Sequence, residues 1–151
     1  GRRVLTEQGP RQFYADGFCV EQATGYHYYT VGFMSLVIAA ARNCDDPLKE
    51  LEPQVHRAFA AGLSFRQPGG RWPAIGDVDS ARAIPVYHDD FWNFDSLCVL
   101  GANLFHDAEL LPSKDEFSEE AYWLLGCETL NSQTETHASG DHSATVLKDA
   151  G

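Results

Sequence analysis

The residues best suited to chemistry lie in the segment from Asp16 to Phe33, which reads DGFCVEQATGYHYYTVGF. An acid, Glu21, precedes Tyr26 by five residues, and His27 and two further tyrosines follow at once. Carboxyl, phenol and imidazole groups can each transfer a proton when they are held against a substrate. Tyrosine rings also pack in protein cores with the hydroxyl hydrogen-bonded. On the residues alone, Tyr26 and Tyr29 are therefore candidates either for a site or for the core.

A second polar segment, GGRWPAIGDVDSAR, spans Gly69 to Arg82. A turn-favouring glycine stands directly before Asp77 and Asp79, and Arg82 follows. Two carboxylates at this spacing can bind sugar hydroxyls or act as an acid/base pair. Aspartates also form turns through side-chain to backbone hydrogen bonds, so a structural role stays open. Because Trp72 anchors the segment, we expect it to be ordered and to face the same cleft as Tyr26.

Helices must position these two segments, because apolar residues recur at helical spacing and no clear strand precedes residue 144. We expect an all-α class made of helical hairpins. The first strong helix is apolar on every side, which is typical of a helix inside a larger body. The expected helices run from Thr24 or Gly25 to about Asn43, from Pro47 or Pro53 to Phe65, from Asp89 or Asp90 to about Phe105, and from Ser118 to Gly126. Residues 1–10 read like the tail of an earlier helix, and Trp123 is expected to be buried.

Composition limits the partners. Twenty-two acidic against eleven basic residues give a formal net charge of -11, which argues against nucleic acid. No two of the four cysteines form a CxxC pair, so we assign no metal and no cofactor. Cys44 and Cys98 stand in apolar runs and are expected to be buried. The longest apolar run, Val31 to Ala41, is too short to span a bilayer, so a soluble protein is expected.

Taken in order, these segments resemble the heparinase II/III-like polysaccharide lyases and the related toroid-fold alginate lyases. In that family an Asp-Gly, a Glu and then a Tyr precede an aromatic-rich helix, as in DGFCVEQATGYHYYTVGF. IGDVDSAR is similar to the family's Gly-Asp-x-Asp loop. AYWLLG, followed by a polar stretch and VLKDAG, is similar to the place where the toroid ends and the β-sandwich begins. The resemblance covers nearly the whole chain.

The resemblance implies an internal piece of an enzyme that cleaves uronic-acid-containing polysaccharide by β-elimination. Residues 1–130 would be part of an (α/α) toroid, and residues 131–151 a linker and the start of the following β domain. Tyr26 aligns with the catalytic acid/base. The family's carboxylate-neutralising Asn or His would lie before Gly1, and a further histidine beyond Gly151. Residues expected to bind substrate or line the cleft are Glu21, His27, Tyr29, Trp72, Asp77, Asp79, Arg82 and His88.

The partner implied by the resemblance is an acidic polysaccharide, met in the periplasm or outside the cell. Two other functions remain open from the residues: a glycoside hydrolase that uses Asp77 and Asp79, and a non-catalytic sugar-binding or structural module. We further expect the isolated chain to self-associate through exposed helix faces. We also expect it to be inactive alone, because part of the site is missing.

Overall fold

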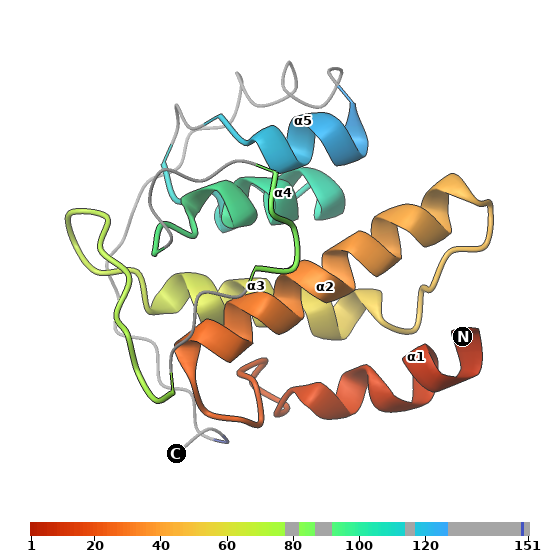
Figure 1. Cartoon of the computed structure of the whole chain (residues 1–151), viewed down its shortest axis with the longest axis horizontal. Coiled ribbons are helices and arrows are strands. Elements are labelled where there is room, and N and C mark those ends of the chain that lie inside the picture. Colours follow the sequence, from red (N-terminus) through yellow and green to blue (C-terminus); the bar gives the residue numbers. More distant parts are fainter. Residues whose placement is uncertain (78–81, 87–91, 114–116, 127–148, 150–151) are drawn as a thin grey trace.

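The computed structural model describes residues 1–77, 82–86, 92–113, 117–126 and 149. Within these ranges the chain forms five α-helices and two short 3₁₀ helices (Figure 1). Their bounds are α1 Arg2–Gln8, η1 Pro10–Gln12, α2 Thr24–Asn43, α3 Glu52–Ser64, α4 Asp95–Phe105, η2 Ala108–Leu110 and α5 Glu119–Leu125. Extended pairing in the described part consists of two isolated antiparallel bridges, Phe13 with Cys19 and Gln67 with Arg71. The expected all-α class is therefore confirmed for this part of the chain.

Helices α2 and α3 form an antiparallel hairpin. At one end, the Tyr28 hydroxyl donates to the Gly62 carbonyl at 3.0 Å. At the other end, Arg42 of α2 pairs with Glu52 of α3 at 2.9 Å. Arg42 also donates to the Leu104 carbonyl at 2.6 Å, so the ends of α2 and α4 lie together. Figure 1 shows α1 on one side of this hairpin, with α4 and then α5 on the other.

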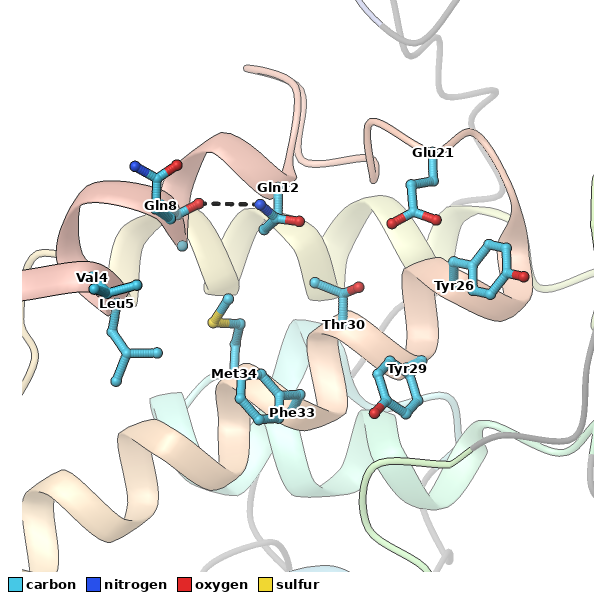
Figure 2. A pocket seen from close by; sticks show the side chains of 11 residues that line it. Val4, Leu5, Gln8, Gln12, Glu21, Tyr26, Tyr29, Thr30, Phe33 and Met34 are labelled. Carbon is cyan, nitrogen blue, oxygen red and sulfur yellow. Dashed lines mark hydrogen bonds between the residues drawn. The ribbon is translucent and has the colours of Figure 1, made fainter. Parts of the chain in front are cut away.

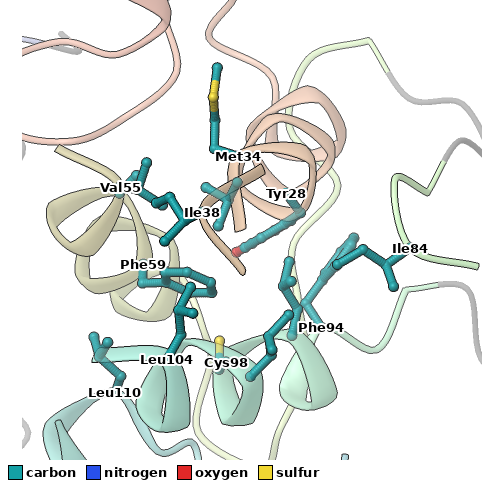
Figure 3. Packing of buried hydrophobic residues seen from close by; sticks show 14 of the residues in the cluster. Tyr28, Met34, Ile38, Val55, Phe59, Ile84, Phe94, Cys98, Leu104 and Leu110 are labelled. Atoms are coloured by element: carbon teal, nitrogen blue, oxygen red, sulfur yellow. The ribbon is translucent and has the colours of Figure 1, made fainter. Parts of the chain in front are cut away.

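The core lies where α2, α3 and α4 meet (Figure 3). Its main members are Tyr28, Val31, Met34 and Ile38 from α2, Val55 and Phe59 from α3, and Phe94, Cys98 and Leu104 from the α4 region. Each buried aliphatic or aromatic side chain stabilises the fold by roughly 1.5–3 kcal/mol. The opposite stripe of α2, made of Tyr29, Phe33 and Leu36, stays exposed. Only one side of this helix is therefore covered.

Local signals in the sequence predicted most of the helix ends correctly. Helix α2 begins at Thr24, α3 carries Pro53 in its first turn, and the Ser118 hydroxyl accepts the Ala121 N–H at 3.0 Å to cap α5. Helix α4 begins at Asp95, later than the expected Asp89 or Asp90.

Two burial predictions were wrong. Trp123 is 68% exposed, because the seven-residue helix α5 turns Glu120 and Ala121 inward instead. Cys44 is exposed because it stands at the end of α2, past the last core turn, whereas Cys98 is buried as expected.

The boundary after residue 130 and the expected linker and β-domain start, residues 131–151, lie outside the described residues, apart from Asp149. In the part of the chain that the structure describes, no helix combines the length and apolar character needed to span a membrane.

Candidate functional site

A cavity of about 510 Å³ lies between α1, η1 and the first half of α2 (Figure 2). Its volume falls in the roughly 300–1,000 Å³ range of ligand sites. The lining residues are Val4, Leu5, Gln8, Gly9, Gln12, Glu21, Tyr26, Tyr29, Thr30, Phe33 and Met34. Three of the residues expected from sequence, Glu21, Tyr26 and Tyr29, therefore share one cavity.

Tyr26 closes one end of this cavity. Figure 2 shows its ring beside the cavity and its hydroxyl pointing away from Gln12 and Met34. The hydroxyl donates a hydrogen bond to Oδ2 of Asp77 at 3.0 Å. Asp77 is exposed and stands 51 residues further along the chain. The structure thus brings one residue from each of the two polar segments together, as the sequence predicted for Asp77.

The segment before Asp77 reaches Tyr26 because it completes the first turn of α2. The Thr24 N–H donates to the Ile75 carbonyl at 2.9 Å, and the Ile75 N–H donates to the Thr24 hydroxyl at 3.0 Å. The same hydroxyl donates to the Pro73 carbonyl at 2.9 Å. These contacts satisfy backbone groups that a helix start leaves without intrahelical partners. The loop therefore caps the start of α2 and places Asp77 beside Tyr26.

Gly76 makes this close approach possible. Its φ of +76° is a conformation that L side chains rarely adopt. A Cβ at this position would lie 2.9 Å from the Cβ of Ala23, closer than carbon atoms pack. A residue with a side chain would consequently push the loop off the start of α2.

Glu21 reaches the cavity from the segment that precedes α2. Asp16 accepts the Phe18 N–H at 3.1 Å, which forms a turn, and the bridge between Phe13 and Cys19 closes it. Figure 2 shows the Glu21 carboxylate turned toward the space between Gln12 and Tyr26. Glu21 is exposed, so its carboxylate can meet a ligand at the cavity.

His27, expected to bind substrate, is fully buried. Its Nδ1 accepts the Cys19 N–H at 3.2 Å and its Nε2 contacts the Ala58 carbonyl at 3.0 Å. Burial lowers the pKa of His27 from 6.5 to about 4, so the ring is neutral near pH 7. Neighbouring residues on a helix point about 100° apart, and Tyr26 takes the cavity side. The substrate-binding prediction for His27 is therefore wrong: this ring joins α2, α3 and the segment carrying Glu21.

Trp72 and Arg82, which were also expected to bind substrate, do not line the cavity. Trp72 is 8% exposed, and its indole N–H donates to Asp95 at 2.8 Å, which ties the loop to the start of α4. The Arg82 guanidinium donates to the Asn93 carbonyl at 2.7 Å and lies 4.8 Å from the centre of the Phe94 ring. Because Trp72 is buried in the core, the substrate-binding prediction for it is wrong. Arg82 is not among the residues that line the cavity, and its substrate-binding role stays a prediction.

Sequence reasoning missed the contribution of α1 and η1. Gln8 of α1 and Gln12 of η1 line the cavity, and so does Thr30 of α2. Gln8 and Gln12 are four residues apart, and the Gln12 amide donates to the Gln8 carbonyl at 3.4 Å. That spacing is the signal that places two amides on one face. Asp79 and His88, the remaining expected site residues, lie outside the described residues.

The described cavity is acidic to neutral. Glu21 is its charged lining residue, and none of its lining residues is Lys, Arg or His. Among the described residues, no group of three His, Cys, Asp or Glu side chains is placed to hold a metal ion. Comparison with protein-family models, with curated proteins and with solved structures finds no match to this chain. Its function is therefore inferred from the residues and geometry of the cavity.

Proposed function

We propose that this chain is part of a polysaccharide lyase that cleaves uronic-acid-containing polysaccharide by β-elimination, with Tyr26 as the general acid/base. The observation that carries the proposal is the Tyr26 hydroxyl at the end of the cavity, hydrogen-bonded to Asp77 at 3.0 Å. The two residues come from the two segments that resemble lyase motifs. On the same resemblance, the helices form part of an (α/α) toroid, and the enzyme meets its polymer in the periplasm or outside the cell.

The geometry supports the proton-donor half of the reaction most directly. In β-elimination, a base removes the proton beside the uronate carboxylate, and an acid protonates the leaving glycosidic oxygen. The phenol that donates to Asp77 carries its proton, and that proton can reach the glycosidic oxygen once the hydroxyl turns from Asp77 to the substrate. Asp77 fixes the direction of this hydroxyl and is a positioning residue.

The proton-acceptor half needs a cation or hydrogen-bond donors close to the phenolate. Since His27 is buried and neutral and Arg82 packs on Phe94, neither supplies that charge at the cavity. A group that neutralises the substrate carboxylate is also required, because the reaction builds negative charge there. The resemblance assigns that group to residues outside this chain.

The test is Tyr26→Phe in the catalytically active protein that contains this chain. The change keeps the ring and removes only the hydroxyl, so turnover should fall at least about 100-fold while the fold is retained. The readout is the ultraviolet absorbance of the unsaturated uronate product. Near-normal turnover would exclude Tyr26 as the acid/base.

Tyr29→Phe is the matched control, since its ring lines the same cavity and is 41% exposed. It should change turnover less than about tenfold, because it lacks the contact with Asp77. Cleavage without a double bond would instead support a hydrolase. Binding without cleavage would support a sugar-binding module.

A further inference from the structure

The polar groups of the cavity are suited to an uncharged ligand. Four of its lining residues carry amide or hydroxyl groups: Gln8, Gln12, Thr30 and Tyr29. Exposed aromatic surface is supplied by Tyr29 and by Phe33, which is 42% exposed. Amides and hydroxyls can both donate to and accept from sugar hydroxyls. Aromatic faces pack against the apolar C–H face of a sugar ring.

The same cavity is unfavourable for an anion. A ligand carboxylate or sulfate would lie beside the Glu21 carboxylate, with Asp77 on the far side of the Tyr26 ring. None of the lining residues is Lys, Arg or His, so no lining charge offsets that repulsion. Partial removal of an anion from water without a partner adds a further cost. The net charge of the chain, -11, has the same sign as the charge of such a ligand and adds to the repulsion.

The cavity and the reactive hydroxyl lie on opposite sides of the Tyr26 ring. The ring lines the cavity, whereas the hydroxyl points away from it toward Asp77 (Figure 2). A sugar held in the cavity is therefore the neighbour of the sugar that reacts at the hydroxyl.

We propose that this cavity binds an uncharged sugar residue next to the reacting uronate. This inference rests on the proposed function. The substrate is then a heteropolymer in which uncharged sugars flank the uronate, and a polymer made only of uronates is disfavoured. Glu21 is the residue that sets this preference, because it places a fixed negative charge at the cavity.

Binding to the 151-residue chain tests the preference without any catalysis. The two probes are cellotriose and the β-1,4-linked trimer of glucuronic acid, which share a backbone and differ in the carboxylates. Titration followed by NMR should show cellotriose shifting the signals of Tyr29 and the Gln12 amide. At low ionic strength the uronate trimer should bind at least about fivefold more weakly, a gap that shrinks with added salt.

Glu21→Gln should reduce the difference in affinity between the two probes, because it should strengthen the binding of the uronate trimer alone. Glu109→Gln is the matched control, because it removes the same charge from η2, which takes no part in the cavity lining. That variant should leave the gap unchanged. Equal or tighter binding of the uronate trimer by the unmodified chain would overturn the proposal. So would the failure of both probes to bind at about 10 mM, which is weaker than ordinary substrate affinities.

These titrations test the sugar preference independently of the catalytic role proposed for Tyr26. Binding does not require the Tyr26 hydroxyl, so the titrations are repeated on Tyr26→Phe. If Tyr26 proves not to be catalytic, these titrations still decide whether the cavity prefers the uncharged probe. If the uronate trimer is preferred, the neutral-sugar assignment fails while the Tyr26 result is untouched.

Discussion

At the residue scale, adjacent side chains of one motif have opposite environments. Tyr26 and Tyr29 are three positions apart and share the cavity face, whereas His27 and Tyr28 turn into the core. The helical period of about 3.6 residues enforces this division. A run of four polar-tipped rings at a helix start therefore supplies two rings for a site and two for packing.

His27 should make the fold sensitive to mild acid. Burial lowers its pKa from 6.5 to about 4, so the unfolded chain binds a proton more readily than the folded one. The stability due to the neutral ring is full above about pH 6.5 and declines as the pH falls toward about 4. We expect the free energy of unfolding to fall by about 2 kcal/mol from this residue between pH 7 and pH 5. Urea denaturation at the two pH values measures it.

His27→Gln is the control for this prediction. The Gln amide can still donate to the Ala58 carbonyl, but it does not titrate. The variant should be less stable at pH 7, because the Cys19 N–H loses its acceptor, and it should show a flatter pH dependence. A variant with the same pH dependence as the unmodified chain would contradict the assignment.

At the element scale, the start of α2 depends on a loop that is distant in sequence. Thr24 and Ile75 exchange hydrogen bonds, and Gly76 allows the loop to lie against Ala23. Gly76→Ala should therefore displace the loop, separate Asp77 from Tyr26 and lower the free energy of unfolding by about 1–3 kcal/mol. Chemical denaturation measures the free energy of unfolding, and the turnover assay proposed for Tyr26→Phe, applied to Gly76→Ala, reports the lost contact.

Gly69→Ala separates backbone strain from crowding. Gly69 also has a positive φ, +88°, but nothing lies within 4 Å of a Cβ built there. Gly69→Ala should lower the free energy of unfolding less than Gly76→Ala does, by about 1 kcal/mol or more. Equal costs for the two variants would show that contact with Ala23 is unimportant.

At the scale of the whole molecule, the exposed stripe of α2 should drive self-association of the isolated chain. Tyr29, Phe33 and Leu36 lie side by side on a helix whose other side is core. Contiguous apolar surface of this kind promotes contact between molecules. Light scattering across a concentration series should show mass growth, and Phe33→Ser should reduce it. Phe117→Ser, an equally drastic change on another exposed ring, should reduce it less, whereas a monomer at all concentrations would refute the prediction.

We also expect no elimination activity from the purified 151-residue chain. Positioning of base, acid and substrate together supplies much of an enzyme's rate. The described cavity lining holds Tyr26 but has no Lys, Arg or His to neutralise a uronate carboxylate. Incubation with a panel of uronate polymers should give no absorbance from unsaturated product, with a known lyase as positive control. Robust product formation would show that the site is complete.

The helical class, most helix ends and the place of Tyr26 at a helix start were predictable from the sequence alone. These follow from local signals: apolar periodicity, Pro53 in the first turn of α3 and the Ser118 cap of α5. Such signals act over a few residues, so they remain readable without knowledge of the fold. They also suggested that the loop bearing Asp77 would face Tyr26.

The side chains that line the cavity could be identified only from the packing of the helices against one another. Helix α2 is apolar all round, so its sequence carries no asymmetry to show that the Val31 and Ile38 face is core. Burial of His27 depends on Cys19 and Ala58, which reach it from other segments. Gln8 and Gln12 line the cavity because α1 and η1 lie beside α2. Contacts between distant segments depend on how whole elements dock, and periodicity along one segment does not encode that.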